Sequence, residues 1–142
     1  PDLFIIDLNL KLKKNLSIIN FTRKRKFFLI TTVNNGKKIN FFKKKGFKII
    51  LVNSLSSKDD FKKMFQYIYQ LGYCRAFFET GLTFLNVLLK YKLLNILYVF
   101  QSNIMLKKNG LNNSTPYYLK KIKLNKKIKI NLINDTLYKK KF

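Results

Sequence analysis

Short apolar runs alternate along this chain with stretches whose apolar residues recur every three or four positions. Runs of this length are typical of buried strands, and they occupy Leu3–Ile6, residues 27–30 and residues 47–52. Asp7 ends the first run and Gly46 precedes the third. Because helical stretches and short links separate the runs, the order favours an α/β domain with a mostly parallel sheet flanked by helices.

Two of the intervening stretches carry clear helix boundaries. Gly46 is expected to end a short helix that begins near Lys37. A second helix is expected to start at a cap formed by Ser57 or Asp59 and to stop at Gly72. Its apolar residues fall at helical spacing: Phe61, Met64, Phe65, Ile68 and Tyr69.

The rest of the chain continues the alternation and ends in an antiparallel hairpin. The other expected elements are a turn at residues 34–36, a fourth strand at 75–78, a turn at 79–81, a helix through 82–89, a strand at 94–101, a loop at 107–116, and hairpin strands at 127–133 and 136–140 turned at Asn134-Asp135. The length of 142 residues, with 47% apolar residues, suits one core and one domain.

Composition excludes several classes of chemistry. The chain has no His and one Cys, so a Ser-His triad, a His-ligated metal and a disulfide framework are ruled out. Cys74 lies beside an expected strand, where a small buried apolar residue is the ordinary role of a free cysteine. Lys90 and Lys92 interrupt the most apolar stretch, residues 82–100, so a membrane span is not expected and the cytoplasm is the expected compartment.

The net charge of +24 admits two interpretations. Thirty Lys and Arg face six Asp and Glu, and the lysines accompany abundant Asn, Ile, Phe and Tyr, a bias typical of compositional drift with Lys as surface filler. The alternative is a polyanion-binding surface, because such a charge attracts nucleic acid at low salt. Lysine-rich runs at 24–26, 43–45 and 139–141 suit either interpretation.

Ligands in parallel sheets bind at the carboxyl ends of strands, and one such end is chemically unusual. At Glu79-Thr80-Gly81 an expected strand passes into a helix through a glycine, where first-turn N–H groups favour an anion. A purely structural role is the alternative, in which Glu79 favours the helix start and Asp7 ends a strand and opens a turn. Thr31 and Thr32, at the end of the second run, are expected to be ordinary strand residues.

Residues 72–110 resemble the reductase domain of riboflavin biosynthesis, the second half of the bifunctional pyrimidine deaminase/reductase. That family has a strand ending in Val-Glu-Gly-Gly, a Thr-Leu helix start, Leu-Leu, and a later strand leading to Leu-Leu-Gly. The matching segments here are Phe78-Glu79-Thr80-Gly81-Leu82-Thr83-Phe84, Leu88-Leu89, Lys92-Leu93-Leu94-Asn95-Ile96, Ser102-Asn103 and Met105-Leu106-Lys107. The segments at 4–12 and 28–32 are similar to its Val-Val-Leu-Asp-Ser-x-Leu-Arg-Leu and Val-Phe-Thr-Thr segments.

The resemblance implies a dihydrofolate-reductase-like fold and an NADPH-dependent oxidoreductase. The reaction would reduce 5-amino-6-(5-phosphoribosylamino)uracil, a ribosylaminopyrimidine phosphate, to its ribitylamino form. By position, Glu79 would contact the substrate, and the NADPH-binding residues would be Asp7, Leu8, Asn9, Gly81, Leu82, Thr83, Phe84 and Leu85. No side-chain nucleophile is needed, since hydride comes from the cofactor.

The resemblance also implies how much of the reductase domain this sequence covers and which partners the protein has. Residues 1–142 would form the C-terminal part of one reductase domain, with the family's first strand and deaminase domain upstream and no activity expected from this part alone. Homodimers are common in the family, whose first site glycine is Thr80 here, a position where positive φ would be strained. The alternative function is a basic nucleic-acid- or ribosome-associated binding protein without catalysis.

Overall fold

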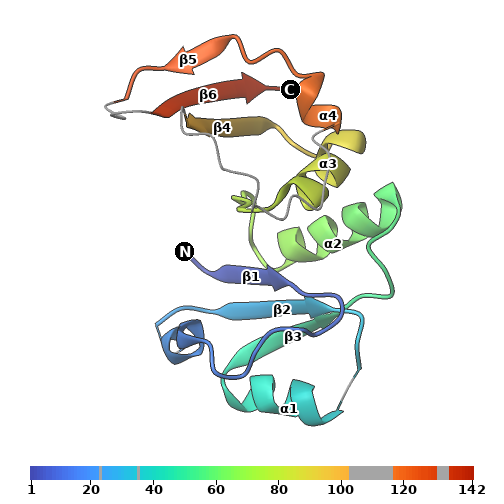
Figure 1. Ribbon diagram of the computed structural model, residues 1–142. Helices are drawn as coiled ribbons and strands as arrows, with labels where there is room; N and C mark the ends of the chain where they lie inside the picture. The colour runs from blue at the N-terminus through green and yellow to red at the C-terminus, as the bar shows by residue number, and fades with distance from the viewer. Residues whose placement is uncertain (23, 35, 103–116, 131–134) are drawn as a thin grey trace, which may run out of the picture. The chain divides into compact units, whose positions relative to one another are not determined.

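The chain forms two compact units, Pro1–Arg75 and Ala76–Phe142. The computed structural model describes residues 1–22, 24–34, 36–102, 117–130 and 135–142 (Figure 1). Both units combine helices with a three-stranded sheet, so the predicted α/β class is confirmed. That residues 1–142 belong to one reductase domain stays a prediction.

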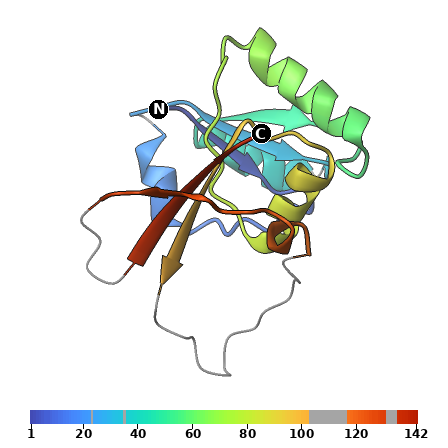
Figure 2. The same ribbon diagram turned by 90° about the horizontal axis from the view of Figure 1, so that it is seen from above.

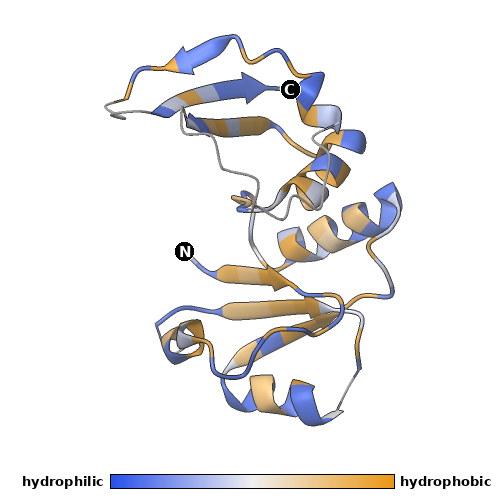
Figure 3. Ribbon diagram, in the orientation of Figure 1, coloured by the Kyte–Doolittle hydropathy of each residue, from blue (hydrophilic) through white to orange (hydrophobic). Residues whose placement is uncertain are grey.

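The first unit is built on a parallel sheet in the order β1-β2-β3 (Figure 2). Its strands are β1 (Leu3–Ile6), β2 (Phe27–Thr31) and β3 (Phe47–Leu51), as the apolar runs predict. All five residues of the central strand β2 are buried. A strand buried on both faces needs apolar residues at every position rather than at alternate ones, as in residues 27–30 of β2, whereas the exposed Lys48 interrupts the run of the edge strand β3 (Figure 3).

One face of this sheet packs on α1 (Gly36–Lys44) and the short 3₁₀ helix η1 (Ser17–Phe21). Alternate strand residues point to the same face, so Phe27 and Leu29 enter one core together. The buried members of that core are Leu10, Ile19, Phe27, Leu29, Ile39, Phe42 and Phe47. The predicted helix near Lys37 is confirmed, although it begins at Gly36, where the sequence predicted a turn.

The opposite face lies toward α2 (Lys58–Gln70), whose Phe61, Met64 and Ile68 are buried as their spacing predicts (Figure 1). On this face the rings of Phe4 and Phe28 stack with centroids 4.3 Å apart. The Tyr73 ring meets both by its edge, and its hydroxyl donates a hydrogen bond to the Asp2 carboxylate. Both faces of the parallel sheet are therefore covered.

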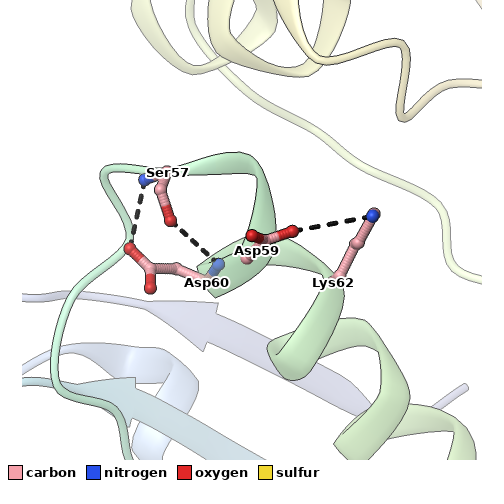
Figure 4. Close-up of polar contacts among 4 residues, drawn as sticks. All are labelled: Ser57, Asp59, Asp60 and Lys62. Atoms are coloured by element: carbon pink, nitrogen blue, oxygen red, sulfur yellow. Dashed lines mark hydrogen bonds and ion pairs between the residues drawn. The ribbon is translucent and has the colours of Figure 1, made fainter.

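A capping box fixes the start of α2 (Figure 4). The Asp60 N–H donates to the Ser57 hydroxyl at 3.2 Å, and the Ser57 N–H donates to the Asp60 carboxylate at 3.1 Å. The same carboxylate oxygen accepts from the Ser54 hydroxyl at 2.5 Å and from the Ser56 N–H at 3.0 Å. Ser57 is thus the cap, and Asp59 instead pairs with Lys62 at 3.6 Å in the first turns.

Asp60→Asn is expected to lower the melting temperature at pH 7 and to lose most of that effect in strong acid. The Ser54 hydroxyl, followed by the Ser57 and Ser56 N–H groups, holds the pKa of Asp60 far below its usual value. A carboxylate with a depressed folded-state pKa stabilises above its unfolded pKa of about 3.9, and that contribution falls away as the pH drops below it. Thermal melts of both proteins from pH 7 to pH 2 measure the difference.

The control for this experiment is Asp59→Asn, which removes one exposed carboxylate from the same helix turn. It should melt close to the parent protein at each pH, since exposed ion pairs contribute little. A gap between Asp60→Asn and the parent that stays constant down to pH 2 would contradict the assigned role of the carboxylate.

Glycines with positive φ end α1 and α2, as the sequence predicts. Gly46 has φ +90° and Gly72 has φ +94°. A Cβ on Gly72 would meet no atom within 4 Å, so Gly72→Ala tests backbone strain alone. We expect it to lower the free energy of unfolding by about 1–2 kcal/mol in urea denaturation.

Gly36→Ala is the matched control, because its Cβ also enters open space but φ there is not positive. At the start of α1 this change should leave stability unchanged or raise it by about 0.5–1 kcal/mol. If the two alanine variants unfold at the same urea concentration, the positive φ at position 72 is not the reason that a glycine is favoured there.

The second unit is built on an antiparallel sheet in the order β4-β6-β5. Its described elements are α3 (Leu82–Lys90), β4 (Ile96–Ser102), α4 (Tyr117–Lys120), β5 (Lys126–Ile128) and β6 (Asp135–Lys141). The pairing of β5 with β6 confirms the predicted hairpin, with Asp135 as the first residue of β6. The predicted turn residue Asn134 and the predicted loop at 107–116 lie outside the described residues.

Two expectations about the sheet are wrong. The strand predicted at 94–101 was assigned to a mostly parallel sheet, but β4 pairs antiparallel with β6 along seven residues, from Ile96↔Lys141 to Ser102↔Asp135. The strand predicted at 75–78 does not form. Within the described ranges no strand pairs with it, and an apolar run without a partner strand cannot satisfy its backbone groups in a sheet.

Because no strand forms at residues 75–78, side chains in and beside this segment are exposed. Phe77 is 78% exposed, and Cys74 is exposed rather than buried as predicted. Both lie in residues 73–80, which contain the division between the two units.

Candidate functional site

The carboxyl end of the parallel sheet gathers the first set of predicted site residues. The Leu8 carbonyl, directly after β1, accepts hydrogen bonds from the Thr32 N–H at 3.1 Å and the Thr32 hydroxyl at 2.7 Å. The Thr31 hydroxyl donates to the same carbonyl at 3.1 Å. Thr31 and Thr32 therefore tie the segment after β1 to the end of β2, which is a structural role.

Asp7 fixes the loop that follows. Its carboxylate accepts a hydrogen bond from the Leu12 N–H at 2.6 Å, and its carbonyl accepts from the Leu10 N–H at 3.1 Å. Leu10 has φ +51°, and the Lys38 ammonium group donates to its carbonyl. The turn-opening interpretation of Asp7 agrees with these bonds. A cofactor contact by Asp7, half-buried Leu8 or exposed Asn9 stays a prediction.

The same end of the sheet carries the helix start that the sequence predicted near Lys37, and this helix start is basic. After β2, α1 begins at Gly36 with Lys37 and Lys38 in its first turn, and no acidic residue stands there. A helix N-terminus with adjacent ammonium groups favours an anion. The signal in the sequence was an apolar strand followed by Gly-Lys-Lys at a helix start.

The second set of predicted site residues lies at the start of α3. Gly81 is the N-cap with φ −75° and ψ 170°, and no side chain caps this helix end. The Gly81 carbonyl accepts from the Leu85 N–H at 3.1 Å. The first-turn residues Leu82 and Phe84 are half-buried, whereas Thr83 is exposed. A Cβ on Gly81 would meet no protein atom within 4 Å, so the backbone at this helix start is open to a ligand.

The residues that precede Gly81 are also accessible. Glu79 and Thr80 are exposed. Among the described non-glycine residues only Leu10 and Lys92 have positive φ, so the strain expected for Thr80 does not arise. The exposed Glu79 carboxylate has no hydrogen-bond or ion-pair partner in the described part of the chain, which leaves it available to a polar ligand.

The predicted site residues fall into two groups in different units. Asp7, Leu8 and Asn9 belong to Pro1–Arg75, whereas Glu79 and Gly81 to Leu85 belong to Ala76–Phe142. The second group contains the uncapped helix start at Gly81, whereas Asp7 and Leu8 of the first group accept hydrogen bonds from their own loop and from the end of β2. No described helix is long and apolar enough to cross a bilayer.

Comparison with known proteins gives no assignment. No protein-family model matches the chain, and no curated protein matches it.

Proposed function

We propose that this chain is the reductase part of a riboflavin-pathway enzyme with a dihydrofolate-reductase-like fold, acting in the cytoplasm. The proposal rests on the ordered resemblance described above and, in the structure, on one observation. The helix start at Gly81 lacks a side-chain cap and has open space where a Cβ would stand. That is the backbone arrangement that a cofactor phosphate requires at the position where the resemblance places one.

The protein's contribution would be binding and orientation. When bound, NADPH would supply the hydride for reduction of 5-amino-6-(5-phosphoribosylamino)uracil to its ribitylamino form. The first-turn N–H groups after Gly81 would hold the cofactor's phosphates. The contacts of Asp7, Leu8 and Asn9 with the cofactor rest on the resemblance alone. Glu79 would accept hydrogen bonds from the substrate. Positioning of this kind accounts for catalysis without a side-chain nucleophile.

The test is a fluorescence titration of NADPH with the full-length polypeptide at low and high salt, with NADH as the control. We expect saturable NADPH binding that survives high salt, because backbone N–H groups and packing are less screened than surface charges. Tighter binding of NADPH than NADH would show recognition of the 2′-phosphate. Binding that disappears with salt would show that the lysines act only as an anion trap and would contradict the proposal.

A further inference from the structure

One face of the antiparallel sheet is rich in exposed rings. Alternate residues of β4 share a face, and on one face these are Ile96, Tyr98 and Phe100, which are 41%, 41% and 65% exposed. Such a row of exposed apolar side chains on one strand requires an explanation, because soluble chains normally turn that face inward.

Lysines lie beside these rings on the neighbouring strand. Directly opposed residues of antiparallel strands share a face, so Lys141 stands beside Ile96 and Lys139 beside Tyr98. The Lys139 ammonium group lies 5.5 Å from the centre of the Tyr98 ring. Lys126 of β5 opposes Lys139 from the other side, which adds a third ammonium group.

The remaining positions complete this surface. Phe100 and Ile128 flank Leu137, which is buried at the centre of the face. The one acidic residue placed on this face by the register of the described strands is Asp135, at the end of β6 opposite Ser102. We call the surface formed by Ile96, Tyr98, Phe100, Lys126, Lys139 and Lys141 the ring-and-lysine face.

We propose that the ring-and-lysine face binds single-stranded nucleic acid. Exposed aromatic rings provide stacking partners for bases, and ammonium groups beside them neutralise phosphates. Alternate side chains on a strand are about 6.8 Å apart, twice the ~3.4 Å rise of a stacked nucleotide strand. Bases that stack on Tyr98 and Phe100 must therefore separate from one another, which a single strand permits and a duplex does not.

Charge complementarity favours this occupant over a second copy of the chain. A self-complementary interface would enclose Lys126, Lys139 and Lys141 of both copies in one contact area, and like charges brought together there are destabilising. The chain's charge of +24 opposes self-association as well. This binding is separate from reductase chemistry, because it uses none of Asp7, Glu79 or Gly81.

The experiment measures fluorescence polarisation of a labelled oligothymidylate of about 12 nucleotides bound to the full chain. Tyr98→Ala/Phe100→Ala is expected to weaken binding by at least about 10-fold, since each stacked base contributes a factor of roughly 5–150. Tyr69→Ala/Phe77→Ala removes the same two ring types from positions 65% and 78% exposed elsewhere, and should bind within twofold of the parent protein.

A second pair of variants separates local contact from net charge. Lys139→Ala/Lys141→Ala and Lys43→Ala/Lys44→Ala each remove two lysines. Only the first is expected to reduce the slope of log affinity against log salt, by about 0.7 per lost phosphate contact. The oligothymidylate annealed to its complement should bind less tightly than the single strand.

Three results would overturn the proposal. The first is equal loss of affinity in the two ring variants, and the second is a duplex that binds as tightly as the single strand. The third is binding to vesicles of anionic lipid that is lost in Tyr98→Ala/Phe100→Ala while oligothymidylate binding is kept, because the rings would then contact lipid. Circular dichroism of each variant establishes that it is folded before binding is compared.

Discussion

Phe42→Ala is expected to lower the free energy of unfolding by about 3–5 kcal/mol. The whole free energy of unfolding of a typical domain is only ~5–15 kcal/mol. Phe42 is fully buried on α1, and its ring meets those of Phe47 and Phe41 with centroids 5.2 and 5.3 Å away. Removing the ring loses its burial and leaves a cavity between α1 and the sheet, since close-packed neighbours collapse only partly. Urea denaturation followed by circular dichroism measures the loss.

Phe77→Ala is the matched control, because it removes the same ring from a position that is 78% exposed. Its effect should stay within about 0.5 kcal/mol, as for most surface substitutions. If Phe42→Ala unfolds at the same urea concentration as Phe77→Ala, the packing of α1 on the sheet does not stabilise the protein as the structure indicates.

Most helices and strands of the first unit can be predicted from the sequence, because the residues that determine each of them are close together in the chain. Short apolar runs predict β1, β2 and β3, and Gly46 and Gly72 end helices where positive φ excludes most other residues. Ser57 caps α2 through its hydroxyl, which accepts from the N–H of Asp60, only three residues away. Each of these signals lies within one or two turns of chain, which is the range over which sequence patterns specify structure.

The second unit depends on partners that are distant in sequence. The apolar pattern of β4 is compatible with either sheet, and the pairing with β6, some forty residues later, decides the matter. The run at 75–78 has strand-like composition but no partner among the described strands, so exposure of Cys74 followed from topology rather than from its neighbours. The exposure of the Tyr98 and Phe100 rings depends on the same pairing of distant segments, so the apolar pattern of β4 does not predict it.

The candidate site shows the same division between local and distant determinants. The helix start at Gly81 was predicted from the glycine and the apolar periodicity that follows, and the structure confirms the helix. The bond from the Leu12 N–H to the Asp7 carboxylate and the contact of Lys38 with the loop after β1 were not predictable. They depend on a left-handed residue, Leu10, which no sequence rule favours at that position.

Gly81→Val is expected to weaken NADPH binding by the full-length polypeptide by about 10- to 100-fold, the loss of one or two hydrogen bonds to a charged group. The Cβ of the new side chain enters space that holds no protein atom within 4 Å, so we expect the valine to compete with a ligand phosphate rather than with the fold. Valine is a poorer N-cap than glycine, which costs about 1 kcal/mol of stability. Fluorescence titration of NADPH, alongside thermal melts, separates the two effects.

Gly72→Ala serves as the control for stability, because it is expected to cost as much free energy of unfolding at a helix end that the proposed site does not use. It should bind NADPH as the parent protein does. Equal NADPH affinity in Gly81→Val and Gly72→Ala would show that the cofactor's phosphates do not bind at the start of α3. The proposed reductase function would then lose the structural observation on which it rests, because no other uncapped helix start in the described part of the second unit adjoins a glycine.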